Sequence, residues 1–311
     1  MADANDSRPQ RPVLEVYVPA APRSLWTRLE ALLDDYNVFA IDDADSDIDG
    51  ITNAPPTSRR VFFFSATERD RASQAVAREL GSQGVKATLV DVRDDGWAER
   101  AQRHLHAVQI DDVLITPPWD QPIRGCTARY VVEIEPSMGF GTGHHASTQL
   151  AVRALLRYRN EVRRSQHLLD IGTGSGILAI TAAMLGAPSV TAIDRDADAL
   201  ANARHNIARN TVKPTITLVH TDLADLPSPA VSAADVVLAN LTSAAFERYQ
   251  HTLAQLVTPS GLLIATGIMQ LEELMVRTKL RPALIDEMRI DADEWVALAF
   301  RRQQRAPETN A

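Results

Sequence analysis

The spacing of apolar and polar positions divides the chain into two stretches with different element orders. The first stretch alternates between strand-like and helix-like segments in the order β-α-β-β-α-β, which is typical of a ferredoxin-like unit. The expected elements are Val13–Val18, Ser24–Tyr36, Val38–Ile41, Arg60–Ser65, Thr67–Ser82 and Val85–Val92. The pattern therefore predicts a small α+β domain over residues 13–93, with an acidic, proline-containing loop from Asp42 to Ser58.

Beyond His167, short apolar runs alternate regularly with segments of helical spacing. The expected strands are Leu168–Ile171, Val190–Ile193, Ile216–His220, Val236–Ala239 and Gly261–Thr266, and the expected helices are Gly176–Leu185, Ala197–Ala208, Ala244–Leu256 and one beginning at Leu271. This alternation favours a parallel sheet with helices on both faces. The last two strands, near Ala283–Ile290 and Trp295–Phe300, have no helix between them and should form an antiparallel hairpin at one edge.

The intervening segment contains a second glycine-rich stretch. A helix is expected over Asp94–His106, with strands at Asp112–Thr116 and Arg129–Ile134, before Pro136-Ser-Met-Gly-Phe-Gly-Thr-Gly-His-His145 leads into a helix from Ser147. A glycine loop that feeds a helix is a possible ligand cradle. The predicted division of the chain is a disordered arm (1–12), the α+β domain (13–93), a linker helix with strands (94–135), the main domain (136–303) and a polar tail (304–311).

Composition narrows the classes of function. The formal net charge of −8 argues against a surface that follows nucleic-acid phosphates and suits a basic partner. No run approaches the roughly 18 apolar residues of a membrane span, and the polar first residues lack the apolar core of a signal peptide. We therefore expect a cytoplasmic protein without direct nucleic-acid or membrane binding. The single cysteine, Cys126, excludes an internal disulfide framework.

The stretch from Leu168 to Gly176 carries the clearest chemical signal. A strand ends in a turn with alternate glycines at Gly172, Gly174 and Gly176 and then opens a helix, which leaves backbone N–H groups available to a polar or anionic ligand. The turn predicts a nucleotide-type cofactor. The dinucleotide fingerprint would require a small residue where this chain has Ile177, which disfavours a nicotinamide-dependent oxidoreductase but leaves it open.

Polar residues follow at the ends of successive expected strands. Asp170 and Asp194 close the first two strands, Asp222 lies just beyond the third, and Asn240 ends the fourth. Parallel strands bring these positions to one crevice, where Asp194 could hold ribose hydroxyls and Asp222 could meet an adenine amino group. The alternative for each aspartate is a helix cap or a turn, and for Asn240 a cap of the next helix. His144 and His145 have no cysteine or carboxylate at ligand spacing, so we expect no metal site.

With these residues assembled, the chain resembles the ribosomal protein L11 methyltransferase family, a class I group that depends on S-adenosylmethionine (SAM). The specific motif is Phe140-Gly-Thr-Gly-His-His-Ala-Ser-Thr148, close to the family's F-G-T-G-x-H-x-T-T, together with the stretch from Asp170 to Ala179. The resemblance covers about Asp94 to Phe300. It implies a seven-stranded Rossmann-like class I methyltransferase sheet, preceded by a small ferredoxin-like α+β domain.

The resemblance also implies roles for individual residues. Thr142 and the backbone from Gly141 to Gly143 would hold the methionine end of SAM, with Phe140 against it. Asp170 and Gly172, in the same turn as Gly174, would face the amino acid moiety. Asp194 would hold the ribose, Asp222 would lie on the adenine side, and Asn240 would lie at the methyl-acceptor end. The cofactor-binding set implied in this way is Phe140, Gly141, Thr142, Gly143, Asp170, Gly172, Gly174, Asp194, Asp222 and Asn240.

The implied activity is N-methylation of protein amines, either lysine side chains or an N-terminal α-amino group, with ribosomal protein L11 as the substrate and Asn240 as the catalytic residue. Alternatives are methylation of another protein, a small molecule or RNA, or a SAM-binding scaffold without activity. The negative charge and the lack of an Asn/Asp-Pro-Pro-aromatic run disfavour RNA. The segment Asn240-Leu-Thr-Ser243 departs from the family's N-I-L-A, and His144 stands where threonine is common, so the departures concern the acceptor more than SAM.

Overall fold

Contacts within the chain gather into two compact units, Met1–His104 and Leu105–Ala311. The computed structural model describes residues 10–19, 23–33, 36, 38–43, 58–63, 65–93, 105–120, 126–135, 143–212 and 216–303. The expected helix that begins at Asp94 lies outside the described residues as far as His104.

The first unit is a four-stranded antiparallel sheet with two helices. Its elements are β1 (Gln10–Tyr17), α1 (Arg23–Leu33), β2 (Val38–Asp43), β3 (Ser58–Phe63), α2 (Ala66–Leu80), the 3-10 turn η2 (Gly81–Gln83) and β4 (Lys86–Arg93). The strand order is β2-β3-β1-β4, with β1 antiparallel to both β3 and β4. Apolar residues of the sheet, such as Val16 and Phe63, pack against Leu29 of α1 and Val76 of α2. The ferredoxin-like order predicted from the sequence is confirmed.

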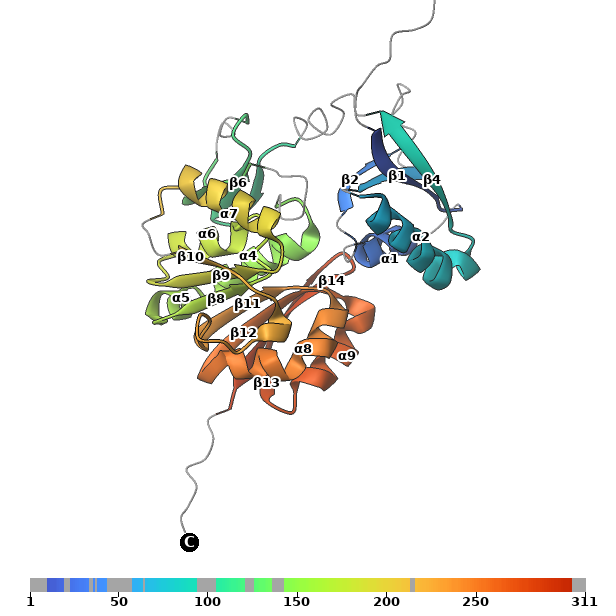
Figure 1. The fold of residues 1–311 in the computed structure, drawn as a ribbon. Coiled ribbons are helices and arrows are strands. Elements are labelled where there is room, and N and C mark those ends of the chain that lie inside the picture. The colour runs from blue at the N-terminus through green and yellow to red at the C-terminus, as the bar shows by residue number, and fades with distance from the viewer. Residues whose placement is uncertain are drawn as a thin grey trace, which may run out of the picture. The chain divides into compact units, whose positions relative to one another are not determined.

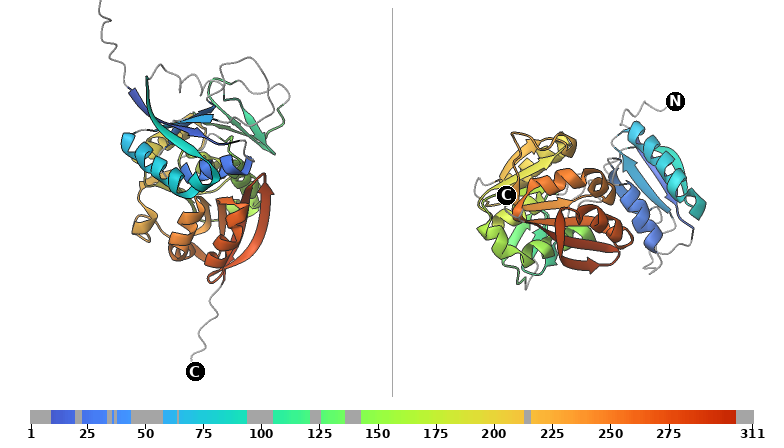
Figure 2. Two further views of the ribbon diagram at one scale, coloured as in Figure 1. Left: turned by 90° about the vertical axis from the view of Figure 1, so that its right-hand side faces the viewer. Right: turned by 90° about the horizontal axis from the view of Figure 1, so that it is seen from below.

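The second unit contains a seven-stranded sheet in the order β10-β9-β8-β11-β12-β14-β13. Its strands are β8 (Leu168–Ile171), β9 (Val190–Asp194), β10 (Ile216–His220), β11 (Ala234–Asn240), β12 (Val257–Met269), β13 (Leu284–Ala292) and β14 (Trp295–Arg302). Strands β10, β9, β8, β11 and β12 run parallel, whereas β14 is antiparallel to β12 and β13. The hairpin of β13 and β14 lies at the edge of the sheet, as expected (Figure 2). The fold class predicted from the sequence is therefore confirmed.

Helices cover both faces of this sheet. They are α4 (Ala146–Arg157), α5 (Arg159–Arg164), α6 (Ile177–Met184), α7 (Ala197–Arg209), α8 (Ser243–Leu256) and α9 (Glu273–Leu280), with short 3-10 turns η3 (Leu223–Asp225) and η4 (Gln270–Glu272). Figure 1 shows the sheet between α4, α6 and α7 on one side and α8 and α9 on the other.

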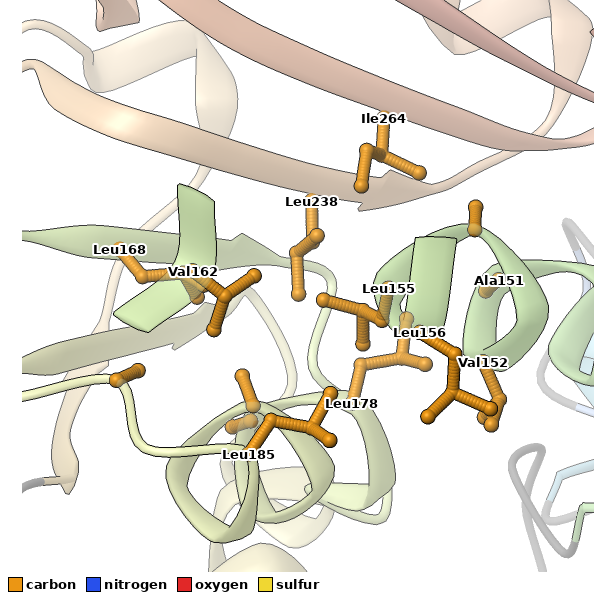
Figure 3. Close-up of a cluster of buried hydrophobic side chains, with 14 of the residues drawn as sticks. Ala151, Val152, Leu155, Leu156, Val162, Leu168, Leu178, Leu185, Leu238 and Ile264 are labelled. Atoms are coloured by element: carbon orange, nitrogen blue, oxygen red, sulfur yellow. The ribbon is translucent and has the colours of Figure 1, made fainter. Parts of the chain in front are cut away.

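Alternate strand residues enter two separate cores. Leu168 and Leu238 pack with α4 and α6, whereas their neighbours Leu169 and Val237 pack with α8 and α9. Figure 3 shows the first core, in which Leu168, Leu238 and Ile264 of the strands meet side chains of α4, α5 and α6. Burial on both faces is what a parallel sheet covered by helices requires, and it explains why these strands read as continuous apolar runs.

A separate three-stranded sheet precedes α4 and belongs to the second unit. It consists of β5 (Val108–Ile110), β6 (Val113–Thr116) and β7 (Tyr130–Glu133) in the order β5-β6-β7. Its buried residues, including Ile115 and Val132, join the core beneath α4 and α6. Strand β5 was not predicted because three residues are too short to show alternation. Helix α5 was not predicted because Val162 is its one buried residue.

Within the described ranges, no helix has both the length and the apolar character to cross a membrane. The same ranges contain no cluster of three or more histidine, cysteine or carboxylate side chains arranged to hold a metal ion.

Candidate active site

The parallel strands bring the predicted polar residues to one edge of the large sheet. Residue Ile171 of β8 pairs with Ile193 of β9 and with Ala239 of β11, so these three strands end side by side. Asp194 ends β9, Asn240 ends β11, and Asp222 follows β10 by two residues. These residues therefore lie at the carboxyl ends of the strands, where the sequence predicts a ligand crevice.

The glycine turn after β8 has a backbone that only glycine adopts easily. The φ angles of Gly172, Gly174 and Gly176 are 67°, 54° and 82°. A Cβ atom on Gly172 would lie 2.8 Å from the Leu241 side chain. Gly172 is exposed although the strand residues before it are buried, so its peptide remains open to a ligand.

Asp170 is a buried carboxylate near the end of β8. It is 1% exposed, and its Oδ2 accepts hydrogen bonds from the Thr173 hydroxyl (2.6 Å) and the Ala179 N–H (3.2 Å). Among the described residues, its Oδ1 is buried without a hydrogen-bond partner. Burial raises the pKa of Asp170 from 3.8 to about 6, although the hydrogen bond from Thr173 opposes this. Such a group is suited to receive a cationic donor, which would pair the oxygen and favour its charged form.

The side-chain carboxylate of Asp194 is hydrogen-bonded to the backbone of the glycine turn. Its Oδ2 accepts the N–H of Gly174 at 2.9 Å, and its Oδ1 accepts the N–H of Asp196 at 3.0 Å. Asp196 in turn caps α7 by accepting the N–H of Asp198. The carboxylate of Asp194 is thus fixed at the strand end, and a carboxylate has lone pairs for further donors.

Asp222 caps a short turn beyond β10. Its Oδ1 accepts the N–H of Ala224 at 2.8 Å, and the Tyr249 hydroxyl lies 3.5 Å from the same oxygen. The capping alternative raised from the sequence is therefore present at Asp222. Its position next to Asp194 is also as expected, because β10 and β9 pair with His220 opposite Asp194.

Asn240 does not cap the following helix. The N-cap of α8 is Thr242, whose hydroxyl accepts the N–H of Ala245, so the structural alternative for Asn240 is absent. The Asn240 side chain instead lies against Gly267 of β12, where a Cβ atom would come within 2.9 Å of Asn240 Oδ1 and would collide with the carbonyl of Leu241. Gly267 has a φ of 80°, and its missing side chain leaves the space that Asn240 and Leu241 occupy.

The second predicted ligand segment is described only at its end. Phe140, Gly141 and Thr142 lie outside the described residues. Gly143 has a φ of 87°, and a Cβ atom there would lie 2.8 Å from Ile115. His145 caps α4 by accepting the N–H of Ser147, and its ring lies 4.6 Å from that of Trp295. Burial lowers the pKa of His145.

Four residues of this region were not identified from the sequence. They are Thr173, which donates to Asp170; Leu241, which packs on Gly172; Gly267, which leaves room for Asn240; and Asn206, which donates to the Ser175 carbonyl. Thr173 could have been found from its place three residues after Asp170 in the turn. The other three become neighbours of the site only through the pairing of strands and helices.

The comparisons agree on one family. Residues 39–303 match the family described as ribosomal protein L11 methyltransferase (PrmA). A ribosomal protein L11 methyltransferase of Geobacillus kaustophilus is 36% identical over 217 residues, which cover 68% of this chain and 67% of the relative. That of Carboxydothermus hydrogenoformans is 30% identical over 261 residues, 83% of this chain and 81% of the relative.

A solved structure supports the same relationship. The crystal structure of ribosomal protein L11 methylase from Lactobacillus delbrueckii subsp. bulgaricus aligns with a TM-score of 0.56 and 28% sequence identity. The alignment covers 65% of this chain and 100% of that chain. These matches favour a methyltransferase over a nicotinamide-dependent oxidoreductase.

Proposed function

Because the chain belongs to the ribosomal protein L11 methyltransferase family, we propose that it methylates amino groups of ribosomal protein L11. The chain is a SAM-dependent methyltransferase. The observation that carries the substrate assignment is the family match over residues 39–303, which runs from β2 in the first unit to β14 in the second. The net charge of −8 supports a basic protein partner rather than a nucleic acid. A ribosomal substrate also fits the cytoplasmic location expected from the sequence.

The site residues fit SAM. The buried Oδ1 of Asp170, which has no hydrogen-bond partner in the described part of the chain, would accept a hydrogen bond from the cofactor's ammonium group. The exposed peptide of Gly172 would lie beside the same amino acid moiety. Asp194 would hold the ribose hydroxyls and Asp222 would lie on the adenine side, in the order in which β8, β9 and β10 stand in the sheet. Following the family resemblance, Phe140 to Gly143 would hold the methionine end.

Bound SAM supplies a methyl group on a positively charged sulfur, an electrophile that needs little acid–base assistance at carbon. The chain has to present a neutral amine in line with that carbon. We assign the orientation of the amine to Asn240. Its Oδ1 can lie at the strand end because Gly267 has no side chain there. An amide oxygen can accept an N–H of the amine without taking its proton, which passes to water.

The pKa of the acceptor amine decides how readily the amine becomes neutral. An α-amino group has a pKa near 7.7 and is partly neutral at physiological pH, whereas a lysine near 10.4 must first lose its proton. An apolar crevice favours the neutral form of either amine. Both classes of acceptor are therefore included in the proposal.

The test is methyl transfer from labelled SAM to purified ribosomal protein L11, with mass spectrometry to locate and count the methyl groups. We expect label on lysine side chains, the N-terminal amine, or both. Labelling of a different protein in a lysate, with L11 left unmodified, would refute the substrate while leaving the SAM-dependent activity intact. Asn240→Ala should lower kcat by a larger factor than it weakens SAM binding. Unaltered turnover in that variant would refute the role of Asn240.

A further inference from the structure

Asparagines recur at four-residue intervals in helix α7 and at its C-cap. Asn202 and Asn206 share one side of the helix because four residues complete just over one turn, and Asn210 is the C-cap. Asn206 is 0% exposed, and its carboxamide joins two segments that are far apart in the sequence. Its Oδ1 accepts the N–H of Glu135, just after β7, and its Nδ2 donates to the carbonyl of Ser175, both at 2.9 Å.

The hydrogen bonds define the orientation of this carboxamide. Turning it over would set its NH₂ group against the Glu135 N–H and its oxygen against the Ser175 carbonyl. Asn202 adds to the preference, because its Oδ1 lies 3.5 Å from Asn206 Nδ2. A buried amide whose oxygen and NH₂ group are both hydrogen-bonded holds its neighbours in place. Loss of either bond costs free energy where water cannot replace it.

Ser175 lies in the middle of the glycine turn. On the strand side, the turn is held by the N–H of Thr173, which donates to the Ile193 carbonyl, and by the N–H of Gly174, which donates to Asp194. On the helix side, Asn206 holds the Ser175 carbonyl. We propose that Asn206 is a positioning residue for SAM binding. It fixes the glycine turn so that the peptide of Gly172 and the carboxylate of Asp170 face the cofactor. This inference rests on the proposed assignment of the glycine turn to SAM.

Asn210 provides an internal comparison one turn along the same helix. It is 8% exposed, its Oδ1 accepts the N–H of Glu133, and its Nδ2 donates to the carbonyls of Glu133 and Asn206. Asn210 thus anchors β7 much as Asn206 does. Within the described part of the chain, it makes no hydrogen bond to the glycine turn. Arg209 also pairs with Glu133, at 2.6 Å, so β7 keeps an attachment to α7 when either asparagine is changed.

The experiment compares Asn206→Asp with Asn210→Asp in the full chain. Each aspartate keeps an oxygen for the backbone N–H and removes the donor. Asn206→Asp thereby sets an oxygen against the Ser175 carbonyl, and Asn210→Asp sets one against the carbonyls of Glu133 and Asn206. We measure the Kd of S-adenosylhomocysteine by calorimetry, the KM for SAM, kcat at saturating SAM, and Tm. We expect the Kd and KM of Asn206→Asp to rise about tenfold with kcat within about threefold of wild type. Asn210→Asp should lower Tm comparably and change the Kd less than about twofold.

The outcomes separate positioning from simple stabilisation. Equal losses of affinity in the two variants, or wild-type affinity in Asn206→Asp, would overturn the proposal. If the charged variant does not fold, Asn206→Ala and Asn210→Ala give the same comparison without a buried charge. Failure of the wild-type protein to bind S-adenosylhomocysteine would instead refute the assignment of the glycine turn to SAM, and the inference with it.

Discussion

The two ends of the candidate site are built in different ways. We call Asp170–Gly176 with Asp194 the cofactor side, and Asn240–Ser243 with Gly267 the acceptor side. On the cofactor side, one short turn supplies most of the groups, and backbone hydrogen bonds such as Gly174 N–H to Asp194 fix it. On the acceptor side, the position of Asn240 depends on the absence of a side chain at Gly267, which belongs to the neighbouring strand.

This difference predicts different consequences of substitution. Changes on the cofactor side should alter SAM affinity, because they remove or move groups that we propose to face SAM. Changes on the acceptor side should alter turnover or the affinity for the protein substrate. Leu241 joins the two sides, because its side chain packs where a Cβ atom of Gly172 would lie. The substitutions below test whether the two sides are separable in spite of this contact.

The largest effect is expected from Asp170→Asn. The variant replaces a buried carboxylate by a neutral amide and leaves the ammonium of SAM without its counter-charge, which corresponds to a loss of about 3 kcal/mol, or on the order of a hundredfold in Kd. Calorimetry with S-adenosylhomocysteine measures it. Asp196→Asn, in an exposed cap that still accepts a hydrogen bond, is the control and should bind within about twofold of wild type. Undiminished affinity in Asp170→Asn would remove this residue from the cofactor side.

On the acceptor side, Gly267→Ala should lower kcat by roughly thirtyfold with the Kd of S-adenosylhomocysteine unchanged. The added Cβ atom meets the Leu241 carbonyl and Asn240 Oδ1, and displacement of a positioning group by about 1 Å can reduce turnover up to about a hundredfold. Gly186→Ala is a matched control, because Gly186 also has a positive φ of 103° but contacts Arg163 away from the site. Equal losses of kcat in both variants would indicate general strain.

The glycine turn and the aspartates at its strand ends were predictable from the sequence for a physical reason. Asp170, Gly172 and Gly174 lie within a few residues of one another, and the turn requires glycine wherever φ is positive. The regular alternation of strands and helices then placed Asp194 at the neighbouring strand end. The fold was predictable for the same reason, since apolar runs and helical spacing are local properties of the chain.

The acceptor side and the helix contacts were less predictable because they arise from tertiary packing. Gly267 appears in the sequence as an ordinary glycine near the end of a strand, and its role follows from the pairing of Asn240 with Thr266. Asn206 appears as a polar residue in a helix, although it is completely buried between β7 and the glycine turn. Neither contact is encoded by residues that are adjacent in the chain.

The pH dependence of binding sharpens the assignment of charge to the cofactor side. Burial raises the pKa of Asp170 from 3.8 to about 6 in the ligand-free protein. Binding of an ammonium requires the ionised carboxylate, so affinity for S-adenosylhomocysteine should fall about tenfold between about pH 7 and about pH 5. Calorimetry across this range measures the slope. In Asp170→Asn the slope should disappear, and a slope that persists would assign the titration to another group.

Stability should change with pH in the opposite direction. Because the folded pKa of Asp170 is higher than the unfolded value, the folded state binds the proton more tightly. The resulting stabilisation is fully present below about pH 4 and is lost as the pH rises through about 6, a change of roughly 3 kcal/mol for this group. Urea unfolding of wild type and Asp170→Asn at several pH values isolates it. The difference in unfolding free energy between the two proteins should track the charge on Asp170.

The smallest effect is expected from Ser243→Ala, where this chain departs from the family's N-I-L-A segment. The buried Ser243 hydroxyl donates to Glu272 Oε2 at 2.6 Å, so it holds a carboxylate of η4 next to the start of α8. Glu272 is only half-buried, and water can replace the hydroxyl, so stability should fall by less than about 1 kcal/mol. The kcat and the Kd of S-adenosylhomocysteine should stay unchanged. Thr242→Ala, which removes the N-cap of α8, is the control and should lower stability by about 1 kcal/mol.

A change in the affinity for S-adenosylhomocysteine in Ser243→Ala would show that Leu241 couples the two sides, and the division between them would then fail at that contact.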